Sequence, residues 1–228
     1  MSKICYVCGA PATSREHCPP LCIFPAERDV PNTKSYRRNL ITVPSCDEHN
    51  LRKSNDDEYL MMVLVSHFGN NDLANQHMKT KVMRAWQRRP YLALTAVQNP
   101  QPARINGQET ISFTVDLNRF TRAMELITRG LIFHNLGNPW AGFFRVWSTT
   151  MLPSRVDNAS RILSTSNVIK QEISKIFANQ NFIGENPDIF KYQLHLPVPP
   201  EIHGCARLVF YGGFEVAVLF SPMVEQHD

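Results

Sequence analysis

The sequence has no hydrophobic run long enough to cross a lipid bilayer. Its longest purely apolar run is LMMVLV at residues 60–65, whereas a membrane-spanning helix needs about 20 such residues. The opening residues MSKICYVCGA also lack the apolar core of a secretion signal. We therefore expect a soluble, cytoplasmic protein with no membrane partner.

Internal repeats and low-complexity tracts are also absent from the sequence, and neither sign of charge dominates strongly. The chain has 228 residues, of which 43% are hydrophobic, and a formal net charge of +4. This composition excludes a disordered or fibrous protein and is sufficient for one ordinary domain or two small ones. A pI near 8.8 suits a polyanionic partner such as a nucleic acid, although charge alone does not require one.

Six cysteines in a chain without a secretion signal favour metal binding over disulfides, which persist mainly in oxidising compartments. Cys5 and Cys8 form a CxxC pair, and Cys46 and His49 form a CxxH pair much later in the chain. Two such pairs supply the four ligands of a closed tetrahedral zinc site. The spacing therefore predicts a structural zinc ion near the N-terminus.

The other three cysteines leave one question open. Cys18 and Cys22 lie between the two pairs and are alternative zinc ligands, so the spacing does not fix which cysteines close the site. Cys205 lies in a strand-rich segment and is expected to be a small buried hydrophobic residue.

Hydrophobic periodicity and turn residues predict alternating helices and strands after the cysteine-rich segment. Helices are expected at 56–68, 71–89 (ended by Pro90), 116–137 and 159–180, and near Asp47. Strands are expected at 111–115, 142–152, 190–196, 206–211 and 214–220, with a loop at 98–110 and a turn at Gly212 and Gly213. The expected apolar stripe of the helix at 116–137 contains Phe120, Met124, Ile127 and Leu131.

A second group of polar residues lies between and just after the zinc pairs. Glu16 and His17 are adjacent, Asn39 follows, and Asn50 and Lys53 come directly after the CxxH pair. Hydrolysis of a phosphodiester needs a water that is activated near neutral pH, and histidine has a suitable pKa for that task. It also needs positive charge against the phosphate, and carboxylate and amide oxygens are ligands of Mg²⁺ and Mn²⁺.

In this order and spacing, residues 5–58 resemble the HNH (His-Me finger) endonucleases. The family pattern begins with CxxC, continues with an acid followed by His, and then has an Asn that opens a short hydrophobic strand. A second metal-binding pair comes next; it is followed by His or Asn and, a few residues later, by Lys. This chain has Glu where the family more often has Asp, and CxxH where CxxC is commoner. The resemblance implies a zinc-bound, treble-clef-like ββα finger at residues 1–58.

The resemblance also implies a role for each polar residue. His17 would be the general base, and Glu16 and Asn50 would ligate a catalytic Mg²⁺ or Mn²⁺ that is separate from the structural zinc. Asn39 would orient the histidine loop from the neighbouring strand, and Lys53 would contact phosphate or steady the fold near it. Adjacent strand residues point to opposite faces, so Glu16 and His17 can converge on one phosphate only if the backbone is irregular there. Pro19 and Pro20, which follow closely, lead us to expect such an irregularity.

We therefore expect an α+β fold in three parts: the finger at 1–58, a helical connector at 59–97 and a mixed α/β region with antiparallel strands at 110–228. The segment KTKVMRAWQRRP in the connector is a candidate nucleic-acid surface, because it combines cations with an aromatic residue. The residues concerned are Lys79, Lys81, Arg84, Trp86, Arg88 and Arg89. The alternative is an ordinary helix with a solvated basic face.

Three functions are compatible with this pattern. The first is a metal-dependent endonuclease that hydrolyses DNA, with RNA as the alternative substrate, and leaves a 5′-phosphate as the family does. The second is a zinc-stabilised module that binds nucleic acid or protein without cutting, with Glu16 displaced from a catalytic metal. The third is a nuclease effector whose residues from about 110 onward sense a signal, bind a partner or form a homodimer. The remaining histidines are expected to be structural: His67, His77, His134, His195 and His203.

Overall fold

The computed structural model describes residues 3–30, 34–51, 54–105, 107–148, 150–151, 159–199 and 201–223. The α-helices are α1 (Asp47–Leu51), α2 (Ser54–Val65), α3 (Asp72–His77), α4 (Met83–Arg88), α5 (Pro90–Ala96), α6 (Leu117–Leu136) and α7 (Ala159–Ile176). The strands are β1 (Ser14–His17), β2 (Thr42–Ser45), β3 (Gln98–Ile105), β4 (Gln108–Thr114), β5 (Gly142–Ser148), β6 (Ile183–Asn186), β7 (Phe190–His195), β8 (Gly204–Phe210) and β9 (Phe214–Pro222). Short helical turns are η1 (Leu21–Ile23), η2 (Glu27–Asp29) and the π-helical η3 (Met78–Val82).

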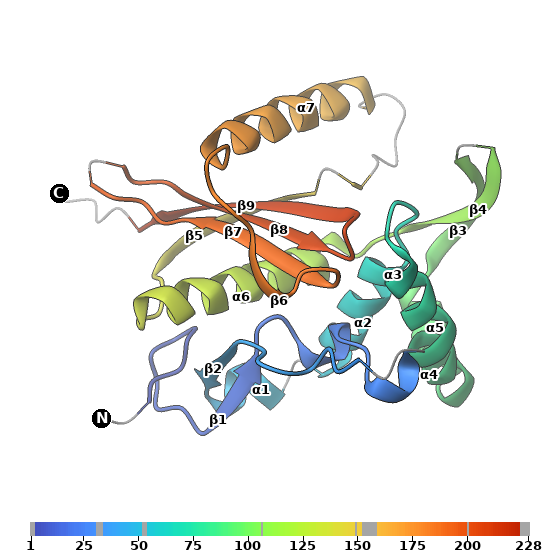
Figure 1. The fold of residues 1–228 in the computed structure, drawn as a ribbon, viewed down its shortest axis with the longest axis horizontal. Helices are drawn as coiled ribbons and strands as arrows, with labels where there is room; N and C mark the ends of the chain where they lie inside the picture. The colour runs from blue at the N-terminus through green and yellow to red at the C-terminus, as the bar shows by residue number, and fades with distance from the viewer. Residues whose placement is uncertain are drawn as a thin grey trace.

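The three sheets formed by the described residues are all antiparallel, which confirms the predicted α+β class. The largest has the strand order β5-β9-β8-β7-β6, and β1-β2 and β3-β4 form two separate two-stranded sheets. Helix α7 lies over one face of the large sheet, and α6 lies along the other (Figure 1). The β1-β2 pair and α1 lie on the far side of α6 from that sheet (Figure 1). The N-terminal segment therefore rests on α6.

Helix α6 follows the sequence prediction closely. Its N-cap residue Asp116 accepts hydrogen bonds from the backbone N–H groups of Asn118 and Arg119, and Gly137 ends the helix with a φ of 75°. All four residues of the predicted apolar stripe are buried. Although α6 is the longest of the described helices, neither it nor any other described helix is long and apolar enough to span a bilayer.

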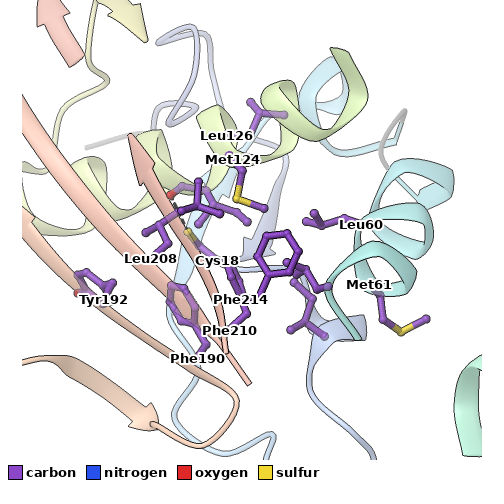
Figure 2. Packing of buried hydrophobic residues seen from close by; sticks show 14 of the residues in the cluster. Cys18, Leu60, Met61, Met124, Leu126, Phe190, Tyr192, Leu208, Phe210 and Phe214 are labelled. Carbon is purple, nitrogen blue, oxygen red and sulfur yellow. Dashed lines mark hydrogen bonds between the residues drawn. The ribbon is translucent and has the colours of Figure 1, made fainter. Parts of the chain in front are cut away.

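One hydrophobic cluster contains side chains from all three predicted parts of the chain. Figure 2 shows Leu60 of α2 and Met124 of α6 beside aromatic residues of the large sheet, and Met61 of α2 belongs to the same cluster. Cys18, from the N-terminal segment, lies in the same cluster. The N-terminal segment, the connector helices and the C-terminal sheet thus share a core, and this core fixes their relative positions.

The single helix predicted at 71–89 is wrong in detail. Helix α3 is followed by the π-helical turn η3 and then by α4, which ends at Arg88. Pro90 then begins α5 instead of ending the helical segment. A proline lacks the N–H that a helix interior needs, but its fixed φ suits the first turn of a new helix.

The loop predicted at 98–110 is also wrong, because residues 98–105 form β3 and pair with β4. Most residues of this hairpin are exposed, so it lacks the buried face that produces an alternating pattern. Pro100 and Pro102 are tolerated because β3 has one neighbouring strand, β4, in the part of the chain that the structure describes. The other predicted strands are confirmed with small shifts at their ends, and β6 is an additional strand that the sequence pattern did not predict.

Candidate metal centre and its surroundings

The four predicted zinc ligands come together in the structure. The Sγ atoms of Cys5, Cys8 and Cys46 and a ring nitrogen of His49 all lie within 4.8 Å of one another. Cys8 Sγ and Cys46 Sγ are 3.8 Å apart, and His49 Nδ1 lies 3.2 Å from Cys46 Sγ and 3.7 Å from Cys5 Sγ. A tetrahedral zinc ion separates its sulfur ligands by roughly 3.8 Å, given Zn–S bonds of about 2.3 Å. The cluster can therefore hold a metal ion and is compatible with zinc.

The CxxC pair is shaped by a tight turn. Gly9 adopts a left-handed φ of 73°, its N–H bonds to the carbonyl of Cys5 at 3.0 Å, and Cys5 N–H bonds to Ala10 O at 2.7 Å. The N–H of Val7 points at Cys5 Sγ at 3.5 Å. Burial opposes ionisation of the Cys5 thiol, but backbone hydrogen bonds from Cys8 and its neighbours hold its pKa below the ordinary value. The thiolate, which is the form that binds zinc, is thus favoured.

The CxxH pair lies at the start of α1. Cys46 precedes the helix, and its carbonyl accepts hydrogen bonds from the N–H groups of His49 and Asn50 at 3.1 and 3.0 Å. The first turn of α1 is held to the segment before β1 by Thr13 Oγ1, which donates to Asp47 Oδ1 at 2.6 Å. Strand β2 leads directly into Cys46, so the helix places His49 opposite the CxxC turn.

Cys18 and Cys22 are not part of this cluster. The Cys18 thiol donates to the carbonyl of Ile127 on α6, and the Cys22 thiol donates to the carbonyl of Asp57 on α2. Burial raises the pKa of Cys22 to about 12. These two cysteines therefore connect the N-terminal segment to the helices, which settles the question that the sequence left open. Cys205 is buried, as predicted, and burial also raises its pKa to about 12.

Glu16 and Asn50 approach the same face of β1. Asn50 Nδ2 donates to Ser14 Oγ at 2.8 Å, and Ser14 shares a strand face with Glu16 because the two residues are two positions apart. Glu16 is only 8% exposed, and its Oε2 accepts a hydrogen bond from Tyr6 Oη at 3.3 Å. The sequence pattern gave no sign of Tyr6 or Ser14, because their roles depend on the way in which β1 faces α1.

His17 is the last residue of β1 and lies outside the zinc cluster. It pairs with Thr42 in regular register, as Glu16 pairs with Val43, so the irregular backbone predicted at Glu16 and His17 is not found. The two side chains consequently leave the strand on opposite faces. Partial burial lowers the pKa of His17, the charge of Arg37 lowers it further, and Glu16 opposes this shift. The imidazole is therefore predominantly neutral near pH 7.

Asn39 does not open a strand, since β2 begins three residues later at Thr42. It is exposed and has a left-handed φ of 54°, a conformation that asparagine tolerates better than most residues. The contact with the histidine segment is made by the backbone instead, through a 2.9 Å hydrogen bond from Cys18 N–H to Ile41 O. Lys53 lies outside the described residues.

Four residues of the predicted basic surface make contacts within the protein. Lys81 donates to the Cys22 carbonyl at 3.0 Å, and burial lowers the pKa of Lys81. The other contacts are Arg84 with Asp29 (2.6 Å), Arg89 with both carboxylate oxygens of Glu58 (2.7 and 2.8 Å) and Trp86 Nε1 with Met62 Sδ (2.8 Å). Lys79 and Arg88 are exposed. The exposed part of this candidate nucleic-acid surface is therefore smaller than its charge count suggests.

Comparison of the chain with protein-family models, with curated proteins and with solved structures finds no match. The geometry of the residues themselves, together with the motif spacing, supports the proposals that follow.

Proposed function

We propose that this protein is a metal-dependent endonuclease of the HNH type, with a structural zinc ion in its N-terminal ββα unit. The substrate would be DNA or RNA, and the reaction the hydrolysis of a phosphodiester bond. The observation that carries the proposal is the separation of two sets of ligands. Cys5, Cys8, Cys46 and His49 satisfy one tetrahedral ion, and Glu16, His17 and Asn50 all remain outside that set.

The second set has the donor atoms that a hard divalent cation requires. Because Asn50 Nδ2 donates to Ser14, its amide oxygen is left without a partner among the residues that the structure describes. Glu16 supplies a carboxylate on the same face of β1. Mg²⁺ or Mn²⁺ held by these oxygens would supply positive charge against the phosphate. Asn50 and Glu16 would keep that charge in place, next to the strand that carries the base.

His17 would act from the opposite face of the same strand. Strand β1 pairs only with β2 among the described strands, so its other edge is free of sheet hydrogen bonds. Two long side chains on opposite faces can both reach a phosphate that lies along such an edge. A predominantly neutral imidazole there can accept a proton from water as the phosphodiester is attacked. Asn39 would support the loop, and Lys53 would contact phosphate, as the resemblance implies.

The non-catalytic module is kept as a second candidate because of one contact. Glu16 is almost fully buried, and its carboxylate accepts the hydrogen bond from Tyr6. A cation can reach this carboxylate only if the Tyr6 contact opens or rearranges. Should that rearrangement not occur, the protein would bind nucleic acid or another protein without cutting.

The two candidates are separated by cleavage assays on single-stranded and duplex DNA and on RNA, each titrated with Mg²⁺ and Mn²⁺. The nuclease requires metal-dependent cleavage, and His17→Ala should reduce its rate by at least about 100-fold while zinc content and fold are retained. His203→Ala is the matched control, because His203 is exposed and lies outside β1. Intact substrates after prolonged incubation, or a His17→Ala variant that cleaves as well as the parent, would reject the nuclease.

A further inference from the structure

A cleft separates the N-terminal segment from the edge of the large sheet. It has a volume of about 370 Å³, within the range of roughly 300–1,000 Å³ that is usual for small-molecule sites. One wall contains Arg15, Asn39 and Thr42, and the other contains Glu185 and Asn186 of β6. The sheet therefore contributes half of a site that the N-terminal segment could not form alone.

The cleft adjoins the proposed catalytic strand. Arg15 is two residues before His17 and shares its strand face, and Thr42 is the cross-strand partner of His17. Both Arg15 and Thr42 line the cleft, as does Cys18, the residue directly after His17. The guanidinium of Arg15 is held to Thr42 by hydrogen bonds from Nε and Nη2. A group bound in this cleft would therefore lie next to the strand that carries His17.

The lining combines apolar walls with amide groups. Phe24, Phe190 and Tyr192 are all at most 4% exposed and form the buried part of the cleft. Figure 2 shows Phe190 and Tyr192 on the sheet, with Cys18 nearby beside α6. Asn186 is 8% exposed, and its side chain lines the cleft. A ligand with matching donors and acceptors could pair with the amide groups of Asn39 and Asn186 that line the cleft.

We propose that this cleft accepts one unpaired nucleotide next to the scissile phosphate, so that the substrate is single-stranded or locally unpaired nucleic acid. The inference rests on the proposed nuclease function. Amide side chains pair with base edges, and apolar walls accommodate a base once it has left the stack. A base inside a duplex is paired and stacked and cannot enter. Glu185 opposes a second phosphate at the sheet side, whereas Arg15 favours one beside β1.

The test is a binding experiment without divalent cations, so that no strand is cut. Fluorescence anisotropy compares a labelled single-stranded oligodeoxynucleotide with the same strand made abasic throughout. The intact strand should bind the parent protein about tenfold more tightly, the equivalent of one favourable base contact. Asn39→Gly removes one amide and tolerates the left-handed φ of 54°, and Asn186→Ala removes the other. Each variant should reduce the difference to about threefold or less.

Two controls make the result specific. Asn167→Ala changes an exposed asparagine on α7, on the opposite face of the sheet, and should leave the tenfold difference unchanged. His203→Ala should also retain it, because His203 is exposed and is not among the residues that line the cleft. Equal binding of intact and abasic strands, absence of binding to either, or the same loss in Asn167→Ala would overturn the inference.

The experiments distinguish rejection of the nucleotide-binding cleft from rejection of the proposed nuclease activity. Cleavage that depends on His17, without a difference between intact and abasic strands, would reject the cleft alone. A tenfold difference without metal-dependent cleavage would reject the nuclease and leave a site for unpaired nucleotides.

Discussion

Asn50 on α1 directly follows His49 of the Cys/His cluster and donates a 2.8 Å hydrogen bond to Ser14 Oγ on β1. This contact joins the proposed structural metal site to the strand that carries the proposed catalytic residues. A metal ion held by this cluster would fix the start of α1 through Cys46 and His49, and α1 in turn would fix the position of the Asn50 amide. Loss of the metal ion should therefore disturb the face of β1 that carries Glu16 as well as the CxxC and CxxH pairs.

The identity of the zinc ligands gives the first prediction. Cys46→Ser should lower the zinc content from one ion per chain to near zero and lower the melting temperature by about 10 °C or more. Zinc content is measured on the purified protein by atomic absorption. Cys22→Ser is the matched control and should retain its zinc, because Cys22 lies outside the cluster. Zinc loss in Cys22→Ser, or full zinc content in Cys46→Ser, would refute the ligand set.

The ion pair between Arg84 and Asp29 gives a second prediction, about stability. Asp29 is 2% exposed and Arg84 donates to it at 2.6 Å, so Arg84→Ala leaves a buried carboxylate without its cation. We expect a loss of about 2–4 kcal/mol in the free energy of unfolding, because partial exposure of Arg84 reduces the cost of breaking a fully buried pair. Urea denaturation measures it. Adding Asp29→Asn to Arg84→Ala should recover part of the loss; two additive losses would argue against the pair.

The exposed cations of the same segment give a third prediction. If the basic face contacts nucleic acid, Lys79→Ala with Arg88→Ala should weaken binding without lowering stability. The slope of the logarithm of the binding constant against the logarithm of the salt concentration should become shallower by roughly 1.4–1.8, as expected for two lost phosphate contacts. Arg145→Ala with Lys170→Ala removes two exposed cations elsewhere and serves as the control. An unchanged slope in the first variant would show that the segment is an ordinary helical surface.

The buried histidine of α3 gives a fourth prediction, about pH. His77 is fully buried, its Nδ1 lies 2.8 Å from Tyr211 Oη, and burial lowers its pKa to about 3. Between pH 6.5 and 3 the unfolded chain binds a proton at this residue and the folded chain does not. The free energy of unfolding should therefore fall as the pH is lowered through this window, by up to about 1.4 kcal/mol per pH unit.

Comparison with His77→Gln isolates this contribution, because protonation of the zinc ligands affects both proteins alike. The variant should be less stable at pH 7 but should lose stability less steeply as the pH falls from 6.5. If the free energy of unfolding fell equally steeply with pH in the parent and the variant, the pH dependence could not be assigned to His77.

The parts that the sequence predicted well are those that depend on local spacing. The CxxC and CxxH pairs place their ligands within single turns, and the stripe of α6 follows the helical period. Strand β3 was missed because most of its residues are exposed, so it has no buried face to impose an alternating pattern. The basic segment was overestimated because the partners of Arg84 and Arg89, Asp29 and Glu58, lie far away in the sequence.

The sequence predicted only in part on which face of a strand each side chain lies. Strand alternation required Glu16 and His17 to diverge unless the backbone was irregular, and β1 is regular at both positions. The prolines that were expected to distort the strand act only after it has ended at His17. The choice between Cys18, Cys22 and the zinc ligands likewise depended on contacts with α6 and α2, which local spacing does not contain.

The central claim is that the oxygens of Glu16 and Asn50 bind a catalytic cation beside His17. A crystal structure of the His17→Ala protein with its zinc, soaked in Mn²⁺ and measured at the manganese absorption edge, tests this claim most directly. The account predicts an anomalous peak about 2.2 Å from a Glu16 carboxylate oxygen and from Asn50 Oδ1, with Tyr6 released from Glu16. A Glu16 carboxylate still bonded to Tyr6, with no manganese beside it, would contradict the account.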